Sequence, residues 1–243
     1  MKTVVAVALV GATFIGLSSG ARAAEPAVPV YSAVYQVEYK GRTVGTTEFA
    51  VTFDAATNAY EFTSRTTARG LLKLLAPANP VVERSHFLVV NDRVRPVEFW
   101  YEDGRKGENN KHVEFDWDKR VAVVSAKDGR REVALDDSTL DSGSVQVALM
   151  QDLIKTGHPG KYSLATDEAK SYEYVDRGEA TTTTGVGTLA TRSFVQQREG
   201  SSRSTWLWAA PELRYLPARI ESRKDNEVQT ALTLMSVEGI KKQ

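Results

Sequence analysis

The chain of 243 residues contains no cysteine and only three histidines. Without cysteine the protein can form no disulfide, use no thiol in catalysis and carry no lipid on a thiol. The histidines, which are His86, His112 and His158, fall on different predicted elements and lack the spacing of metal ligands. His112, Glu114 and Asp116 share one face of a predicted strand, but a solvated outer face explains that pattern better than a metal site does. The sequence therefore predicts no metal site and no cofactor, and a fold that depends on its hydrophobic core.

Neither sign of charge is in excess, because 31 Lys and Arg residues balance 31 Asp and Glu residues. A nucleic-acid-binding protein usually presents a basic face, and a protein that lies on a membrane surface usually presents a basic amphipathic helix. The sequence has neither feature. We therefore expect no nucleic-acid partner.

Long apolar runs are also absent, apart from one over residues 4–17. Lys2 precedes this run, and Ala21-Arg22-Ala23 follows it with small residues where a signal peptidase cleaves. The run is shorter than the ~20 apolar residues of a membrane-spanning helix. We expect residues 1–23 to be a signal peptide that is cleaved after Ala23. Residues 24–243 are then expected to form a single mainly-β periplasmic domain with no transmembrane span.

Motifs for catalysis or phosphate binding are missing as well. No Gly-x-Ser-x-Gly sequence occurs, and Ser142-Gly143-Ser144 stands at a predicted helix start, where capping explains it. Asp136, Asp137 and Asp141 lack the alternation and the closing glutamate of a calcium loop. Gly185-Val186-Gly187 lacks the third glycine and the lysine of phosphate-binding loops. We therefore expect no catalytic residues and a protein that is not an enzyme.

Alternation of apolar and polar residues dominates what is present. Tyr31, Tyr35 and Tyr39, for example, share one face of a segment whose other face is polar, which is the period of a half-buried strand. Turn residues separate such segments, including Asp128-Gly129, a typical hairpin turn. Thr181–Thr184 is expected to be a loop. The predicted strands cover residues 30–40, 44–53, 60–66, 81–90, 94–101, 113–117, 121–126, 131–135, 161–164, 171–176, 188–198, 202–209, 216–223 and 228–237.

One segment has the period of a helix instead. Asp141 and Ser142 can cap its start, and Gly157 can end it, which predicts a helix over residues 141–156. Its apolar residues cover more than one narrow stripe, so the helix must be buried on more than one side. We therefore predict a mainly-β fold, in which one strongly curved, unclosed, barrel-like antiparallel sheet lies around or against this single long helix.

A leucine-rich segment interrupts the strand pattern between residues 68 and 76. Its four leucines, Leu71, Leu72, Leu74 and Leu75, need an apolar partner, but the segment is too short to form a stable helix on its own. They could plug one end of the core. They could also form a mobile apolar flap beside a ligand cavity.

Aromatic residues supply a second set of candidates for ligand binding. Trp206 and Trp208 share a face of one predicted strand, with Tyr215 nearby, so both indoles point inward or both point outward. Trp100 and Trp117 extend the same argument. The residues could fill the core, or they could line a cavity that suits an acyl chain or a similar apolar ligand.

Several of these segments resemble a known family. They are Tyr35-Gln-Val-Glu-Tyr-Lys-Gly41 with Gly45, Arg95-Pro-Val-Glu-Phe99, Val113-Glu-Phe-Asp-Trp117 and the stretch from Trp206 to Glu221. Together they look like the bacterial domain-of-unknown-function 3108 family, over almost the whole chain after residue 23. The resemblance implies an exported, mostly periplasmic β-protein, and it supplies no activity and no catalytic residues. At the level of fold analogy, the architecture is similar to the unclosed barrels of periplasmic lipoprotein carriers.

Three functions are compatible with these features. The first is a non-enzymatic carrier or binding protein for an apolar, lipid-like ligand, with the leucines and aromatic residues named above as the ligand-binding set. The second is a structural or protein-interaction module of the cell envelope, which would dock another envelope protein through a sheet edge or an apolar flap. The third is a hydrolase without a recognisable motif.

The predicted leader can be tested directly. After export the protein should begin at Ala24, because the Ala21-Arg22-Ala23 site follows a short apolar run. The intact mass of the exported protein measures this. A mass that still includes residues 1–23 would contradict both the cleavage and the expected location.

Overall fold

The computed structural model describes residues 25–69, 79–165, 169–197 and 200–241. The expected signal peptide lies outside these ranges, as do Leu71, Leu72, Leu74 and Leu75. Within the described residues, no helix is long and apolar enough to cross a membrane.

Strands make up most of the described chain and form one sheet of 15 strands. Their order in the sheet is β8-β7-β6-β5-β4-β3-β2-β1-β15-β14-β13-β12-β11-β10-β9. The strands are β1 (Tyr31–Tyr39), β2 (Arg42–Asp54), β3 (Ala59–Ala68), β4 (Val81–Val90), β5 (Arg93–Glu102), β6 (Lys111–Asp116), β7 (Val121–Ala126), β8 (Gly129–Ala134), β9 (Thr139–Leu140), β10 (Lys161–Ala165), β11 (Ala169–Thr184), β12 (Gly187–Gln197), β13 (Arg203–Ala210), β14 (Leu216–Lys224) and β15 (Glu227–Glu238).

The order of the strands follows the chain in two meanders that meet at its ends. The first strand, β1, pairs antiparallel with the last, β15, so that Val37 lies opposite Leu232. All neighbouring strands are antiparallel except β9 and β10, which run parallel. The α-helix α1 (Ser144–Thr156) connects these two. Strands β8 and β9 form the two edges of the sheet, which is therefore unclosed.

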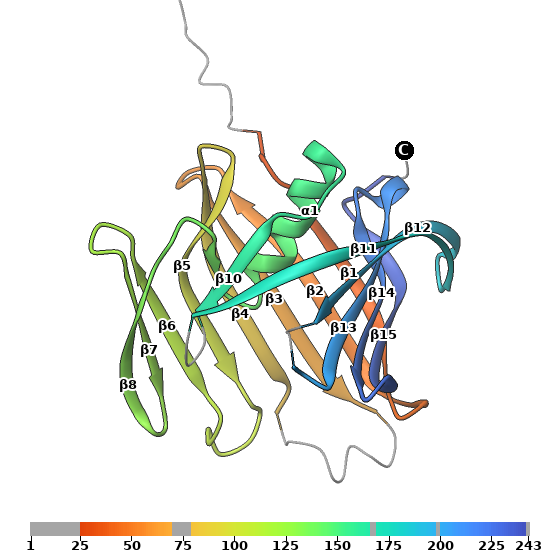
Figure 1. Ribbon diagram of the computed structural model, residues 1–243, viewed down its shortest axis with the longest axis horizontal. Coiled ribbons are helices and arrows are strands. Elements are labelled where there is room, and N and C mark those ends of the chain that lie inside the picture. Colours follow the sequence, from red (N-terminus) through yellow and green to blue (C-terminus); the bar gives the residue numbers. More distant parts are fainter. Residues whose placement is uncertain (1–24, 70–78, 166–168, 198–199, 242–243) are drawn as a thin grey trace, which may run out of the picture.

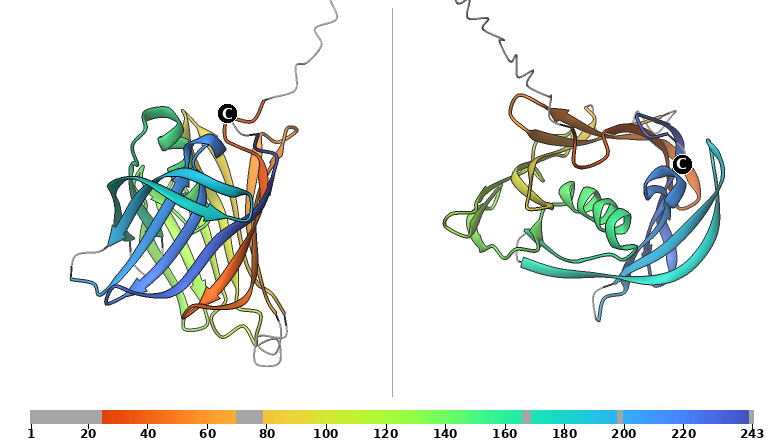
Figure 2. Two further views of the ribbon diagram at one scale, coloured as in Figure 1. Left: turned by 90° about the vertical axis from the view of Figure 1, so that its right-hand side faces the viewer. Right: turned by 90° about the horizontal axis from the view of Figure 1, so that it is seen from above.

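The sheet curves around α1, as the sequence predicted. Figure 1 shows α1 between the strands of the first meander and those of the second. Seen from above, in the right-hand view of Figure 2, the strands surround the helix. Both the mainly-β class and the enclosed helix are therefore confirmed.

Local sequence explains where α1 begins and ends. The carboxylate of Asp141 accepts hydrogen bonds from the backbone N–H groups of Gly143 and Ser144, both at 2.8 Å. The hydroxyl of Ser144 in turn accepts one from the backbone N–H of Asp141, at 2.9 Å. At the other end, Gly157 has a left-handed φ of 72°, and its N–H donates to the carbonyl of Leu153. The predicted hydrogen bonds of Asp141 at the helix start and the predicted stop at Gly157 are both present, but the helix begins at Ser144, three residues later than predicted, with Gly143 in place of Ser142 at the N-cap position.

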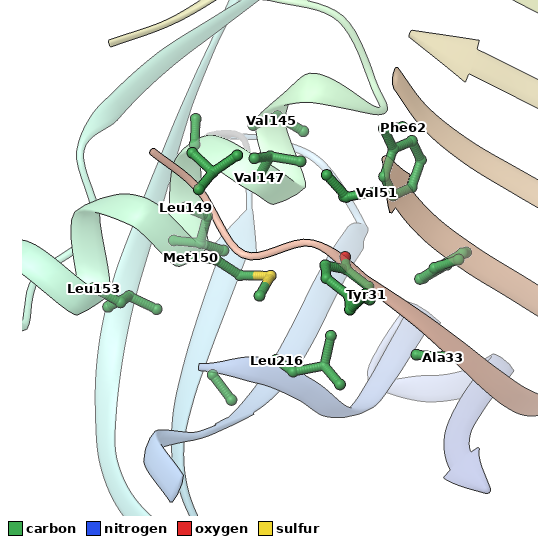
Figure 3. Close-up of a cluster of buried hydrophobic side chains, with 14 of the residues drawn as sticks. Tyr31, Ala33, Val51, Phe62, Val145, Val147, Leu149, Met150, Leu153 and Leu216 are labelled. Atoms are coloured by element: carbon green, nitrogen blue, oxygen red, sulfur yellow. The ribbon is translucent and has the colours of Figure 1, made fainter. Parts of the chain in front are cut away.

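The larger hydrophobic core lies between α1 and the inner faces of the surrounding strands. Leu153 is 1% exposed and Met150 is 2% exposed, whereas Ile154 on the outer side of the helix is 37% exposed. Figure 3 shows Val145, Val147, Leu149 and Met150 of the helix close to side chains of β1–β3 and β14. A smaller cluster joins β5–β8 to the end of β10, and its members are Phe99, Val113, Phe115, Ala122, Val124, Val133, Leu135 and Ala165.

The region after the helix differs from the prediction. Residues 171–176 and Thr181–Thr184 belong to one continuous strand, β11, and the second of these segments is not a loop. The hairpin of β11 and β12 reaches β15, where the N–H of Gly185 donates to the carbonyl of Leu234 at 2.8 Å. A Cβ on Gly185 would lie 2.7 Å from the Cα of Met235. This close approach depends on the tertiary structure, so the local composition of threonine and glycine did not indicate a strand.

Replacement of Leu153 with Ala should lower the free energy of unfolding by about 2 to 5 kcal/mol, because it leaves a cavity beside a fully buried helix face. The matched control is Ile154→Ala on the exposed side of the same turn, which should cost much less. Urea unfolding followed by circular dichroism measures both. Equal effects would mean that the sheet does not enclose the helix as described.

Candidate functional site

A cavity of about 210 Å³ lies between one side of α1 and the inner face of the second meander. We call it the α1 cavity. The helix side is formed by Ser142, Val145, Gln146, Leu149 and Met150. Ser142 precedes α1, and the other four are neighbours at helical spacing, so they lie on one face of the helix. The strand side is formed by Leu164 of β10, Tyr172 and Tyr174 of β11, Gln196 of β12, Thr205 and Leu207 of β13, and Tyr215, Pro217 and Ile220 on or just before β14.

The lining of the α1 cavity is mainly apolar and uncharged. None of the described residues that line it has a charged side chain. Burial raises the pKa of the Tyr174 hydroxyl to about 12, so this group is neutral at physiological pH. The side-chain oxygen of Gln146 is buried and has no hydrogen-bond partner in the described structure. The cavity thus combines a mainly apolar wall with a few neutral polar side chains, a composition typical of small-molecule sites.

A second hollow, of about 220 Å³, lies on the other side of the helix. It is lined by α1 residues that include Gln151, by β10, and by charged side chains such as Arg93, Asp137 and Asp152. Charged walls are costly to desolvate, so this hollow suits an apolar ligand less well than the α1 cavity.

Two acidic side chains, Asp141 and the partly exposed Glu83, lie near each other at the start of the helix. Asp141 is 1% exposed, and its second oxygen accepts a hydrogen bond from the hydroxyl of Ser85 at 2.7 Å. Burial raises the pKa of Asp141, although its hydrogen bonds act in the opposite direction. Burial, together with the nearby Asp141, raises the pKa of Glu83 on β4 from 4.5 to about 7. The charge of Asp141 therefore disfavours ionisation of Glu83.

Of the described residues predicted to bind a ligand, Tyr215 is the one that lines the α1 cavity. It follows the 3-10 helix Pro211–Leu213 and has a positive φ of 60°. The cavity is otherwise built from residues that the sequence did not single out, including Gln146, Tyr172 and Tyr174. Tyr172 and Tyr174 are two residues apart and so share one strand face, but nothing in the sequence indicates which face meets the helix.

Trp206 and Trp208 lie away from the α1 cavity. They alternate with buried Leu207, which lines it, so their indoles occupy the opposite face of β13. There the two rings stack with centroids 5.9 Å apart, and the guanidinium of Arg223 lies 4.4 Å from the ring of Trp206. Arg223 also pairs with buried Glu221 at 2.5 Å. These contacts connect β13 and β14 on the outer face of the sheet.

Trp100 and Trp117 belong to other places in the fold. Trp100 lies between two imidazoles, with ring centroids 4.9 Å from His86 and 5.3 Å from His112. Trp117 stacks beside Phe115 in the smaller core, and its indole N–H donates to the carbonyl of Pro96 at 2.7 Å. Neither residue is among those that line the α1 cavity. The structure therefore does not bring the four tryptophans together.

The two histidines beside Trp100 each contact a carboxylate. His86 is 2.6 Å from Glu61, and His112 is 2.6 Å from Glu98. Among the described residues, no group of three or more metal-binding side chains could hold an ion. These contacts therefore form a surface network of paired side chains.

Comparison with known proteins identifies the family. A model of the family described as protein of unknown function (DUF3108) matches residues 34–233. The chain belongs to the DUF3108 family. The match covers every strand from β2 to β14, which confirms the resemblance seen in the sequence. No curated protein matches this DUF3108 chain.

Solved structures resemble the DUF3108 chain in fold. A β-barrel-like protein of domain of unknown function DUF1849 from Brucella abortus aligns with a TM-score of 0.50 and 10% identity, covering 87% of this chain and 98% of that chain. A chain of the MucA/MucB complex from Pseudomonas aeruginosa aligns with a TM-score of 0.36 and 9% identity, covering 86% of this chain and 51% of that chain. The DUF3108 chain therefore spans about half the length of that protein. A protein assigned as a lipoprotein from Parabacteroides distasonis aligns with a TM-score of 0.35 and 11% identity, covering 88% of this chain and 97% of that chain. At such identities, the DUF1849 likeness supports the barrel-like fold alone.

The raised pKa of Glu83 predicts how stability depends on pH. Because this pKa is about 7 in the folded protein and the ordinary value is 4.5, stability should be lost as pH rises from about 4.5 through 7. Glu83→Gln should remove about 2 to 3 kcal/mol of this loss. Urea unfolding of the parent and the variant between about pH 5 and about pH 8 measures this loss of stability.

The control for this experiment is Glu173→Gln on an exposed position of β11, which should keep the pH dependence of the parent. If Glu83→Gln also kept it, the carboxyl group of Glu83 would titrate as a solvated group.

Proposed function

We propose that the protein is a non-enzymatic binding or carrier protein of the bacterial cell envelope, and that it holds an apolar, lipid-like ligand in the α1 cavity. The observation that carries this proposal is the hollow beside α1, which has a mainly apolar wall without charged side chains. Apolar surface that faces an unfilled hollow loses contacts with other atoms, and a matching ligand would restore them.

The size of the cavity limits what it can hold. A volume of about 210 Å³ is smaller than the ~300 to 1,000 Å³ of sites that enclose a drug-sized ligand. The proposed ligand therefore places one chain, or part of one, beside α1. A folded lipid with several chains would need the helix to move relative to β10–β14.

The sequence supports the envelope as the place of action. The apolar run, the Lys2 ahead of it and the Ala21-Arg22-Ala23 site form the expected export signal. A carrier that works between membranes needs an interior that hides apolar groups from water, which is what the α1 cavity would supply.

A binding titration tests the proposal. N-phenyl-1-naphthylamine is an uncharged apolar dye whose fluorescence increases in an apolar site, and it should bind the full protein. Thr205→Trp places a large side chain in the cavity and should weaken dye binding by about ten-fold or more, because it fills the space. The control is Trp206→Phe, one residue away on the outer face of β13, which should leave dye binding unchanged.

Thermal unfolding of both variants separates loss of binding from loss of the fold. If the parent protein binds no dye, or if Thr205→Trp folds and binds as well as the parent, the carrier proposal is wrong.

A second candidate is an interaction module of the cell envelope, and one observation favours it. Strand β8 forms an edge of the described sheet, and an edge can pair with an extended segment of another protein. However, Arg130, Arg131 and Glu132 occupy this short strand, and charged side chains on an edge protect against such pairing. We therefore rank this function second, and absence of dye binding would favour it.

A further inference from the structure

We propose that the ligand of the α1 cavity has an uncharged, hydroxyl-bearing polar end, as in a fatty alcohol or an acylglycerol, and that Gln146 accepts a hydrogen bond from that hydroxyl. This inference rests on the proposed function, because it concerns the same cavity. It goes further by choosing between classes of amphipathic ligand that differ only in the charge of the polar end.

Gln146 supplies the acceptor for this hydrogen bond. Its side-chain oxygen is buried and has no hydrogen-bond partner in the described structure, and the residue lines the cavity from the helix side. A buried acceptor that has lost its water and gained no partner costs about 1 to 3 kcal/mol. A ligand hydroxyl that donates to this oxygen, once the side-chain amide of Gln146 turns toward the ligand, would remove the cost without bringing a charge into the cavity.

The start of α1 is a place where an anion would normally be expected. The N–H groups of a helix N-terminus can hold a carboxylate or phosphate. Here the N–H groups of Gly143 and Ser144 already donate to Asp141, each at 2.8 Å. A ligand carboxylate near Ser142 would meet the carboxyl group of Asp141 in place of free donors. The helix end therefore favours a neutral ligand over an anion.

The described wall of the cavity offers no counter-charge to an ionic ligand. None of the described lining residues is charged, so neither a carboxylate nor an ammonium group would find a partner in the wall. Burying an unpaired charge is much more costly than burying a hydroxyl that makes a hydrogen bond. Arg219 and Arg223 lie on the far side of β14 and pair with Glu221.

Arg214 is also next to a lining residue along the chain, since it precedes Tyr215. Its Nε atom is buried without a hydrogen-bond partner in the described structure, and the residue is not among those that line the cavity. The experiment must therefore separate a hydroxyl at Gln146 from a carboxylate at Arg214.

Three probes with the same ten-carbon chain make this separation, and they are 1-decanol, decanoate and decylammonium. Each competes with bound N-phenyl-1-naphthylamine on the full protein at about pH 7.5, where both ions are charged. We expect 1-decanol to displace the dye at a concentration about ten-fold lower than either ion. Gln146→Leu should weaken 1-decanol by about five-fold and leave direct dye binding nearly unchanged.

The matched control is Gln151→Leu on the same helix. Gln151 is also buried and has an unpartnered side-chain nitrogen, but it lines the charged hollow on the other side of α1. This variant should keep the preference of the parent for 1-decanol. Thermal unfolding should place both glutamine variants at or above the stability of the parent, because each removes an unsatisfied polar group.

The outcomes distinguish this inference from the proposed function. If the dye binds and decanoate competes as well as 1-decanol, the inference is wrong while the carrier function stands. If Arg214→Met then removes the binding of decanoate, the polar end is an anion held by Arg214. If Gln146→Leu leaves 1-decanol unchanged, the hydroxyl does not contact Gln146. If the parent protein binds no dye, the proposed function itself fails.

Discussion

The burial of one helix inside a curved sheet is the constraint on which the rest of the structure depends. Helix α1 buries residues around most of its circumference, including Leu149 and Leu153, so a flat sheet against one side would leave apolar surface in water. The two meanders solve this by curving from either side of the β1–β15 pair until they surround the helix (Figure 2). A round helix inside a wide sheet also leaves space beside it, and the α1 cavity is that space.

Asp141 links the stability of the helix to the chemistry of the interior. The same carboxyl group binds the first N–H groups of the helix and the hydroxyl of Ser85 on β4, so it joins the helix to the first meander. Its negative charge also contributes to the raised pKa of the neighbouring Glu83, after the larger effect of burial. The interior therefore disfavours further negative charge, although a helix N-terminus lies within it. The proposed choice of a neutral ligand follows from this capping arrangement.

The sequence predicted the fold well, but it predicted few of the residues that line the α1 cavity. Strand positions such as Tyr31, Tyr35 and Phe49 alternate so regularly that their inward face could be read directly. The site depends on which inward faces meet across the helix, and that requires register and curvature over many strands. Trp206 and Leu207 illustrate the limit, because their alternation separates them correctly but gives no sign that Leu207 is the one that faces α1.

Local sequence by itself determined the mainly-β class, the capped helix and its stop at Gly157, because period and capping depend on residues a few positions apart. The same local signals and motifs identified the DUF3108 family. Tertiary structure alone decided that the β11 hairpin reaches β15, that the tryptophans lie outside the α1 cavity, and that Gln146 lines it while its side-chain oxygen has no partner in the described structure. These features arise from contacts between segments far apart in the chain, and no local pattern encodes the distance or the direction of such contacts.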